Sequence, residues 1–139
     1  MSVKSVSFQV KTSGRTDILD ITNKVQNEVS ASGIPDGTAT IFIPGSTAGI
    51  TTIEYESGVV NDLKKAIEKL APAGIHYEHD SRWGDGNGYS HVRAALLGAS
   101  LSVPFNKSDL KLGTWQQIVV LDFDNRPRSR NILIQIVGD

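Results

Sequence analysis

Residues 79–91 contain the densest group of chemically versatile side chains in this sequence. The segment, HDSRWGDGNGYSH, holds two imidazoles, one guanidinium, two carboxylates and three glycines. Imidazoles change charge near neutral pH, and glycines let backbone amides approach a ligand closely. The alternative interpretation is a solvated loop that needs glycine for its turns. The concentration of reactive groups favours a functional site.

The glycines of this segment precede a helix-like run over 92–98. Unpaired amides at the N-terminus of a helix are suited to binding anions. A guanidinium adds a planar fork for phosphate, and a loop carboxylate can hold Mg²⁺ that neutralises phosphate charge. Stacking on Trp83 is the alternative for the arginine, and an Asx turn is the alternative for the carboxylates. The residues that we expect to bind phosphate are Arg82, Asp85, Gly86, Gly88 and Ser90.

His79 and His91 flank the same segment. If the glycines allow the chain to fold back, the two imidazoles approach each other and share a ligand, a water molecule or an ion. They would then either bind a divalent metal, Mg²⁺ or Zn²⁺, or transfer a proton at neutral pH. Two histidines do not complete a metal site. The third ligand would be Glu54, Asp85 or a residue of another chain.

Hydrophobic periodicity predicts the elements that position this segment. Helical spacing of apolar residues predicts a helix from Ile18 to a stop at Gly33, another over 59–70 and a short third over 92–98. Glu54 and Glu56 flank Tyr55 on a predicted strand and would point to one face. The predicted strands are 6–10, 39–43, 49–56, 100–105, 114–123 and 131–137.

Two strand arrangements follow from these positions. The strands 39–43 and 49–56 are close in sequence and are expected to pair, and the last three strands are expected to form a meander with two hairpin-length turns. The second turn carries Arg126, Arg128 and Arg130, which we interpret as a solvated basic cluster. Strands that bracket isolated helices predict an α+β fold with mainly antiparallel pairing.

Composition narrows the class of protein. The 139 residues, of which 39% are hydrophobic, suit one domain over 1–139 with a substantial core. A net charge of −1 without a basic cluster of nucleic-acid-binding size argues against nucleic acid as a partner. The absence of cysteine excludes disulfides and thiolate chemistry. No apolar run has the length of a membrane span, so we expect a cytoplasmic protein that does not enter a membrane.

Three sequence blocks resemble the signature blocks of the YjbQ-like family, in the same order. They are GSTAGITTIE (45–54), GDGNGYSHVRAALLG (84–98) and LGTWQQIV (112–119). The resemblance extends over nearly the whole chain. It implies a YjbQ-like α+β fold, a β-sandwich core with three flanking helices, and a homotrimer. It also matches His79, His91, Glu54, Asn87 and the run 115–117 to family positions, and so implies that these two histidines, Glu54 and Asn87 form the catalytic set.

The resemblance also implies an activity, secondary thiamine-phosphate synthesis, in which a pyrimidine diphosphate joins a thiazole phosphate and pyrophosphate is released. Gly45 and Ile53 stand where a frequent family pattern has a histidine and an asparagine. Our preferred hypothesis is the binding and turnover of a small phosphorylated metabolite. A non-catalytic trimeric metabolite-binding or regulatory protein is one alternative. A metal-dependent hydrolase is the other, disfavoured because Gly45 supplies no ligand. The absence of a Gly-x-Ser-x-Gly motif separately argues against a hydrolase with a serine triad.

Overall fold

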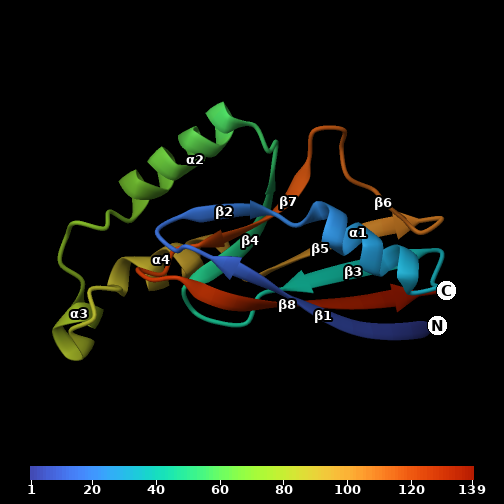
Figure 1. Ribbon diagram of the computed structural model, residues 1–139, viewed down its shortest axis with the longest axis horizontal. Helices are drawn as coiled ribbons and strands as arrows, with labels where there is room; N and C mark the ends of the chain where they lie inside the picture. The colour runs from blue at the N-terminus through green and yellow to red at the C-terminus, as the bar shows by residue number, and fades with distance from the viewer.

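The computed structural model describes residues 1–139 as two antiparallel sheets with four helices (Figure 1). The α+β class and the antiparallel pairing predicted from the sequence are confirmed. The strands are β1 (Ser2–Thr12), β2 (Asp17–Asp20), β3 (Gly37–Phe42), β4 (Ala48–Ile53), β5 (Ser100–Asn106), β6 (Asp109–Leu110), β7 (Gln117–Asp122) and β8 (Arg128–Gly138). The helices are α1 (Thr22–Ala31), α2 (Ser57–Leu70), α3 (Glu78–Trp83) and α4 (Gly88–Leu97).

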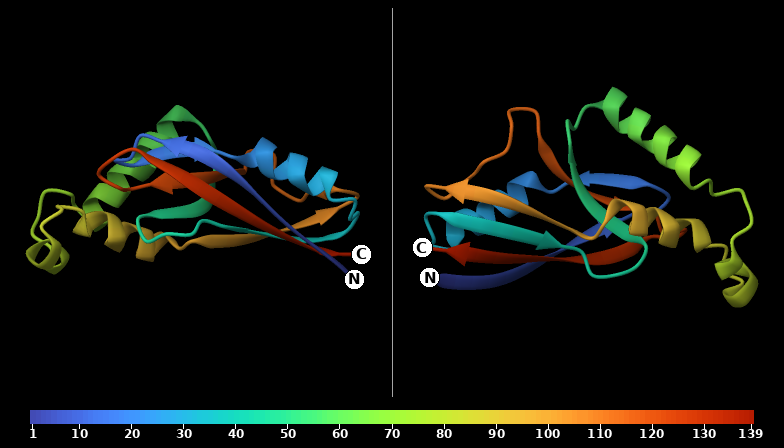
Figure 2. Two further views of the ribbon diagram at one scale, coloured as in Figure 1. Left: turned by 60° about the horizontal axis from the view of Figure 1, so that its bottom comes forward. Right: turned by 180° about the vertical axis from the view of Figure 1, so that it is seen from behind.

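The larger sheet has the strand order β1-β8-β3-β5-β6, and the smaller has the order β2-β7-β4. The two sheets share one hydrophobic core, which includes Ile134 of β8 and Ile50 of β4. Helix α1 contributes Val25 and Val29 to the same core. The two views in Figure 2 show the long strands β1 and β8 side by side along the molecule, with α1 near the end that holds the termini.

Strand β7 is buried on both of its faces. Ile118 and Val120 point into the shared core, whereas Val119 and Leu121 belong to a second apolar cluster. That cluster also contains Ile67 of α2 and residues of α4. Its position between two layers explains why β7 is a nearly continuous apolar run and not an alternating one.

The predicted pairing of neighbouring strands is wrong in two places. The strands predicted at 39–43 and 49–56 lie in different sheets, because β3 pairs with β5 and β8 while β4 pairs with β7. The predicted C-terminal meander does not form either. Of its two turns, only the one after β5 is a hairpin, and β7 and β8 belong to opposite layers. Both β7 and β8 therefore pair with strands from the first half of the chain.

Helix boundaries also differ from the sequence expectations. Ile18 is a residue of β2, and α1 begins only at Thr22. The segment predicted as a continuous loop forms a fourth helix, α3, and α4 already begins at Gly88. Glu56 is not a strand residue. Its carboxylate caps α2 by accepting hydrogen bonds from the amides of Gly58 and Val59, which lower the pKa of Glu56 below its ordinary value.

Four connections gather at the end of the molecule opposite the termini. They are the turn between β1 and β2, the loop between β3 and β4, the α3–α4 pair and the loop between β7 and β8, all at the left of Figure 1. None of the four helices combines the length and the hydrophobicity that crossing a membrane requires. The candidate functional residues lie mainly at this gathered end.

Candidate functional site

Two glycines shape the turn that joins α3 to α4. Gly84 ends α3 in the left-handed conformation, with φ of 66°. Gly88 begins α4 so close to the preceding chain that an added Cβ would lie 2.6 Å from Cβ of Tyr77. The amide of Gly88 donates a 2.8 Å hydrogen bond to Oδ1 of Asp80. A carboxylate of the chain thus satisfies the N-terminus of α4 and interacts favourably with the helix dipole.

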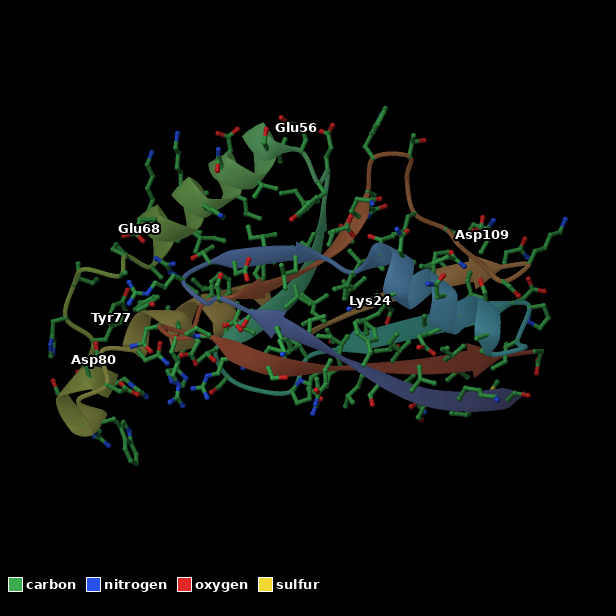
Figure 3. The ribbon with its side chains drawn as sticks, viewed as in Figure 1. Lys24, Glu56, Glu68, Tyr77, Asp80 and Asp109 are labelled. Atoms are coloured by element: carbon green, nitrogen blue, oxygen red, sulfur yellow. The ribbon has the colours of Figure 1, made fainter.

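Three ligand-type side chains meet on this turn. Nδ1 of His79 lies 3.4 Å from Oδ1 of Asp85 and 3.6 Å from Oδ1 of Asp80. This nitrogen is buried and has no hydrogen-bond partner. Figure 3 shows Asp80 on α3, at the tip of the molecule. We call these three residues the His79 cluster.

The ring of His91 packs against the ring of His79 in a tilted arrangement. The ring centroids are 4.3 Å apart, and the planes are inclined by 37°. The expected approach of the two imidazoles is therefore present in the structure. Both side chains remain partly accessible to solvent.

Glu54 does not join the two histidines within one chain. It follows β4, whose first residue, Ala48, lines a cavity together with His91. The last residue of β4, Ile53, lies about 17 Å further along the strand. Trp115 and the residues after it are also at this far end, because Gln117 pairs with Ile53. The family-type positions therefore form two groups at opposite ends of the smaller sheet.

The residues predicted to bind phosphate are dispersed. Arg82 is exposed on α3, and its guanidinium makes no hydrogen bond or ion pair. The hydroxyl of Ser90 is buried and donates to Asn87, so it is not directed toward solvent. Gly88 donates to Asp80, and Gly86 lines a different cavity, whose lining includes no residue of the His79 cluster. Asp85 alone of this set belongs to the His79 cluster.

Asn87 has a supporting position. It is buried, and its side-chain oxygen accepts hydrogen bonds from Ser90 Oγ and from the amide of Asn125. The side chain of Asn125 in turn donates to the carbonyl of Asp85. Asn87 thus ties the turn that carries Asp85 to the loop between β7 and β8. The geometry favours a positioning role over direct contact with a ligand.

A second charged group lies beneath the site, and the sequence interpretation missed it. Asp122 and Asp124 are fully buried, and Arg130 is 9% exposed. Nε and Nη2 of Arg130 donate to the two carboxylate oxygens of Asp122 at 2.7 and 2.9 Å. Thr47 and Arg128 donate to Oδ2 of Asp124. We call these five residues the buried network.

The buried network corrects the interpretation of 126–130 as a solvated basic turn. Arg126 is exposed, but Arg130 points inward from β8. Burial raises the pKa of Asp124, but the hydrogen bonds from Thr47 and Arg128 and the charge of Arg128 outweigh it, so the pKa lies below its ordinary value. The network holds the loop after β3 against β8.

Gly45 lies between this network and His91. A cavity of about 420 Å³ is lined by Gly45, Ser46, His91 and small residues of α4 and the loop after it. Gly45 has φ of 127°, and a Cβ on it would lie 3.1 Å from Nη1 of Arg130. Arg130 therefore takes up space that a side chain at position 45 would need. The absence of a histidine there fits the local packing.

The three ligand-type atoms of the His79 cluster all lie within 4.8 Å of one another, close enough to be considered as ligands of a small divalent cation. Two ligand atoms, each about 2.1 Å from a tetrahedral Zn²⁺, are about 3.4 Å apart. The Nδ1–Oδ1 separations of 3.4 and 3.6 Å agree with this spacing. Both carboxylates also accept backbone hydrogen bonds, as outer-shell support for metal ligands commonly does. One imidazole and two carboxylates leave room for water or substrate oxygens.

The fold and the gathered end define an α+β protein with a two-sheet core and a histidine- and aspartate-lined site. A family model described as UPF0047 protein YjbQ-like matches residues 6–139. The chain belongs to this family.

Curated relatives and solved structures agree with this membership. A UPF0047 protein of Archaeoglobus fulgidus is 38% identical over 130 residues, covering 94% of this chain and 98% of the relative. UPF0047 protein YugU of Bacillus subtilis is 35% identical, and the match covers 95% of this chain and 98% of the relative. The crystal structure of a YbjQ-like protein of unknown function from Sulfolobus solfataricus superimposes with a TM-score of 0.89 at 30% identity, covering 99% and 100% of the two chains. A YjbQ/UPF0047 structure from Clostridium acetobutylicum superimposes with a TM-score of 0.86 at 36% identity, covering 95% of this chain and 99% of that chain.

Proposed function

We propose that this protein binds a small phosphorylated metabolite together with a divalent cation at the His79 cluster and turns the metabolite over. The named candidate reaction is thiamine-phosphate synthesis with release of pyrophosphate. The observation that carries the proposal is the buried, unpartnered Nδ1 of His79, which faces the carboxylates of Asp80 and Asp85. A buried polar atom without a partner is costly unless a ligand satisfies it.

Each residue of the site has a definite task in this proposal. His79, Asp80 and Asp85 would hold the cation, which when bound supplies positive charge for a phosphate or a departing pyrophosphate. His91 stacks on His79 and lines the neighbouring cavity, so it can exchange a proton with a molecule in that cavity. Asn87 holds the turn in position through Ser90 and Asn125. Arg82 would add a phosphate contact from the exposed face of α3.

The proposal is tested first by binding. Differential scanning fluorimetry with Zn²⁺ or Mg²⁺, alone and with inorganic pyrophosphate, should raise the melting temperature, because a ligand that binds only the folded state stabilises it by mass action. His79→Ala should abolish the metal-dependent increase, and His91→Ala should abolish the additional increase due to pyrophosphate. His76→Ala is the matched control, since His76 is exposed and its only hydrogen-bond partner is Ser81. An unchanged response in His79→Ala would contradict the metal site.

Turnover requires a separate assay. The pyrimidine diphosphate and the thiazole phosphate are incubated with the protein and Mg²⁺, and thiamine phosphate and pyrophosphate are quantified by mass spectrometry. Product that disappears in His91→Ala supports catalysis at this site. Binding without product identifies the competing function, a non-catalytic metabolite-binding or regulatory protein. Release of inorganic phosphate without coupling identifies the metal-dependent hydrolase.

The pyrophosphate affinity of Arg82→Ala tests whether Arg82 contacts the phosphate. If it contacts the phosphate, Arg82→Ala should weaken pyrophosphate binding by about 1.5–3 kcal/mol, as expected for a charged hydrogen bond. The melting temperature without ligand should not change, because the side chain is exposed. An unchanged affinity removes Arg82 from the site without affecting the role of His79.

We also propose that the protein assembles as a homotrimer. The 11-residue strand β1 is an edge strand that pairs only with β8, and long unprotected edges favour association. Phe42 and Leu133, each 41% exposed, lie opposite each other on the outer face of the same sheet. Assembly of copies is also one way to bring Glu54 of one chain to the His79 cluster of another.

Multi-angle light scattering tests the assembly. A homotrimer has three times the chain mass of 15.0 kDa. Phe42→Glu should reduce the measured mass, whereas Thr38→Glu, an exposed position of the same strand, is the control. A wild-type monomer at micromolar concentration would contradict the proposal and remove the reason to place Glu54 at the site.

A further inference from the structure

A second cavity, of about 400 Å³, is lined in part by Gly86 of the turn before α4. It is bounded by the turn between β1 and β2, the C-terminal end of α2 and the first turns of α4. Gly86 and Asn125 line it, whereas the neighbouring Asp85 belongs to the His79 cluster. The two sites therefore share a wall but have different side chains.

The floor of this cavity is a rigid, nearly neutral group. Arg93 is 5% exposed, and its Nε donates to the carbonyl of Ala71 at 2.9 Å. Its Nη1 donates to Thr16 Oγ1 at 2.9 Å, and its Nη2 forms an ion pair with Glu68. Figure 3 shows Glu68 near the end of α2 that faces Tyr77. The charge of Arg93 is thus balanced within the protein.

Tyr89 completes the floor. Its ring lies 4.8 Å from the guanidinium carbon of Arg93, a cation–π contact, and the residue is 7% exposed. Its hydroxyl has no hydrogen-bond partner within the protein, and neither has the amide of Gly86. Both residues line the cavity and leave a donor available to a ligand.

Arg15 is the remaining cation of the cavity wall. It is exposed and forms no ion pair within the chain. The backbone holds it in an unusual turn, in which Gly14, Arg15 and Thr16 have φ of 77°, 55° and 65°. The left-handed conformation is energetically unfavourable for residues other than glycine. Amide hydrogen bonds from Arg15 to the carbonyl of Asp124 and from Thr16 to that of Asp122 maintain it.

The charges of the wall have a definite balance. Arg15 and Arg93 contribute two positive charges and Glu68 one negative charge, so the cavity carries one uncompensated positive charge. Since Arg93 and Glu68 are paired with each other, this excess resides on Arg15. A guanidinium beside neutral donors is the arrangement that recognises oxyanions.

We propose that this cavity binds the oxyanion group of a small molecule, a phosphate or a carboxylate, with Arg15 as its ion-pair partner and with Tyr89 and Gly86 as hydrogen-bond donors. The site requires no metal and does not depend on the His79 cluster. The strained turn is accounted for in this assignment, because it places Arg15 in the lining of the cavity.

The test is an amide NMR titration of the ¹⁵N-labelled protein with inorganic phosphate or with acetate, after divalent cations have been removed on a chelating resin and at constant ionic strength. We expect saturable shifts of the Arg15 and Gly86 amide signals, and the anion with the lower Kd identifies the preferred group. Arg15→Gln should weaken binding by about tenfold or more, as expected for a charge-assisted hydrogen bond. Arg126→Gln, an exposed arginine of the nearby loop, is the charge-matched control and should keep the wild-type Kd.

Tyr89→Phe separates the ligand contact from the packing. It retains the ring against Arg93 and removes only the hydroxyl, so a several-fold increase in Kd with an unchanged melting temperature supports the assignment. Shifts that do not saturate, or a Kd that is equal in wild type and Arg15→Gln, would overturn it. Neither result bears on metal binding by His79, which is measured separately with divalent cations added.

Discussion

The buried network and the His79 cluster both combine basic groups with two aspartates, but their packing differs. In the buried network, the arginine and three of the four carboxylate oxygens are held by hydrogen bonds, and Asp122 and Asp124 are fully buried. In the His79 cluster, the nitrogen lies 3.4–3.6 Å from the carboxylates and makes no hydrogen bond. In the buried network, only Oδ1 of Asp124 lacks a hydrogen-bond partner, whereas in the His79 cluster no hydrogen bond joins the histidine to either aspartate.

This difference distinguishes a scaffold from a site. A buried charged group that makes most of its hydrogen bonds within the chain stabilises one conformation and has little capacity for a ligand. A histidine and two carboxylates that share a space without satisfying one another retain that capacity. The charged residues alone do not distinguish the buried network from the His79 cluster. The hydrogen bonds between the basic groups and the aspartates do, because the buried network makes them and the His79 cluster does not.

The largest expected effect is on the buried network. Arg130→Gln leaves the carboxylate of Asp122 buried without its cation, and the free energy of unfolding should fall by about 3–5 kcal/mol. Urea denaturation followed by circular dichroism measures this change. Arg126→Gln, at an exposed position, should remain within about 0.5 kcal/mol of wild type. A loss below 1 kcal/mol in Arg130→Gln would mean that the network is not the scaffold described above.

Gly88→Ala tests the turn that carries the His79 cluster. The new Cβ would lie 2.6 Å from Cβ of Tyr77, so the chain must move, at a cost of about 1–3 kcal/mol. The same movement should reduce the thermal shift caused by Zn²⁺. Gly74→Ala is the control, since its Cβ would meet nothing within 4 Å. Equal stability of the two variants would show that the turn adapts freely.

The acid response should come partly from Asp124. Its pKa is lowered in the folded state, so its stabilising contribution is complete above its ordinary pKa of 3.8 and is lost as the pH falls through the lower folded value. The stability difference between wild type and Asp124→Asn should therefore shrink as the pH is reduced from 6 to 3. Urea midpoints at each pH measure it. A difference independent of pH would contradict this assignment.

The smallest effect on stability is expected at the His79 cluster. His79→Ala removes a partly exposed ring that makes no hydrogen bond. The free energy of unfolding should therefore change by no more than about 1 kcal/mol. The metal-dependent thermal shift should disappear in the same variant. A large loss of stability in His79→Ala, with metal binding retained, would reverse the comparison between the two regions.

Local patterns in the sequence predict part of this structure well. The apolar stripe over 59–70 corresponds closely to α2, because side chains three and four residues apart form one face of a helix. The apolar runs of the last two long strands also predict β7 and β8, although with shifted ends. The approach of His79 to His91 follows from the glycines between them.

Other features depend on contacts that the sequence does not encode locally. The pairing of β8 with β1 joins residues at opposite ends of the chain, so proximity along the sequence favoured the wrong partners. Helix α3 has only six residues, too few for a periodic apolar pattern. The burial of Arg130 did have a signal, since it continues the inward alternation of Ile132, Ile134 and Ile136. The turn that carries Arg15 has no signal in the sequence, because no sequence pattern indicates a left-handed conformation at arginine and threonine.

Strand β7 has a further consequence for the motions of the molecule. Its two faces belong to different apolar clusters, and it is the central strand of its sheet. Any fluctuation that frees its amides must separate both layers at once, which amounts to cooperative unfolding of the whole protein. Hydrogen–deuterium exchange should therefore find the slowest-exchanging amides in β7, directly behind the loops that form the two sites.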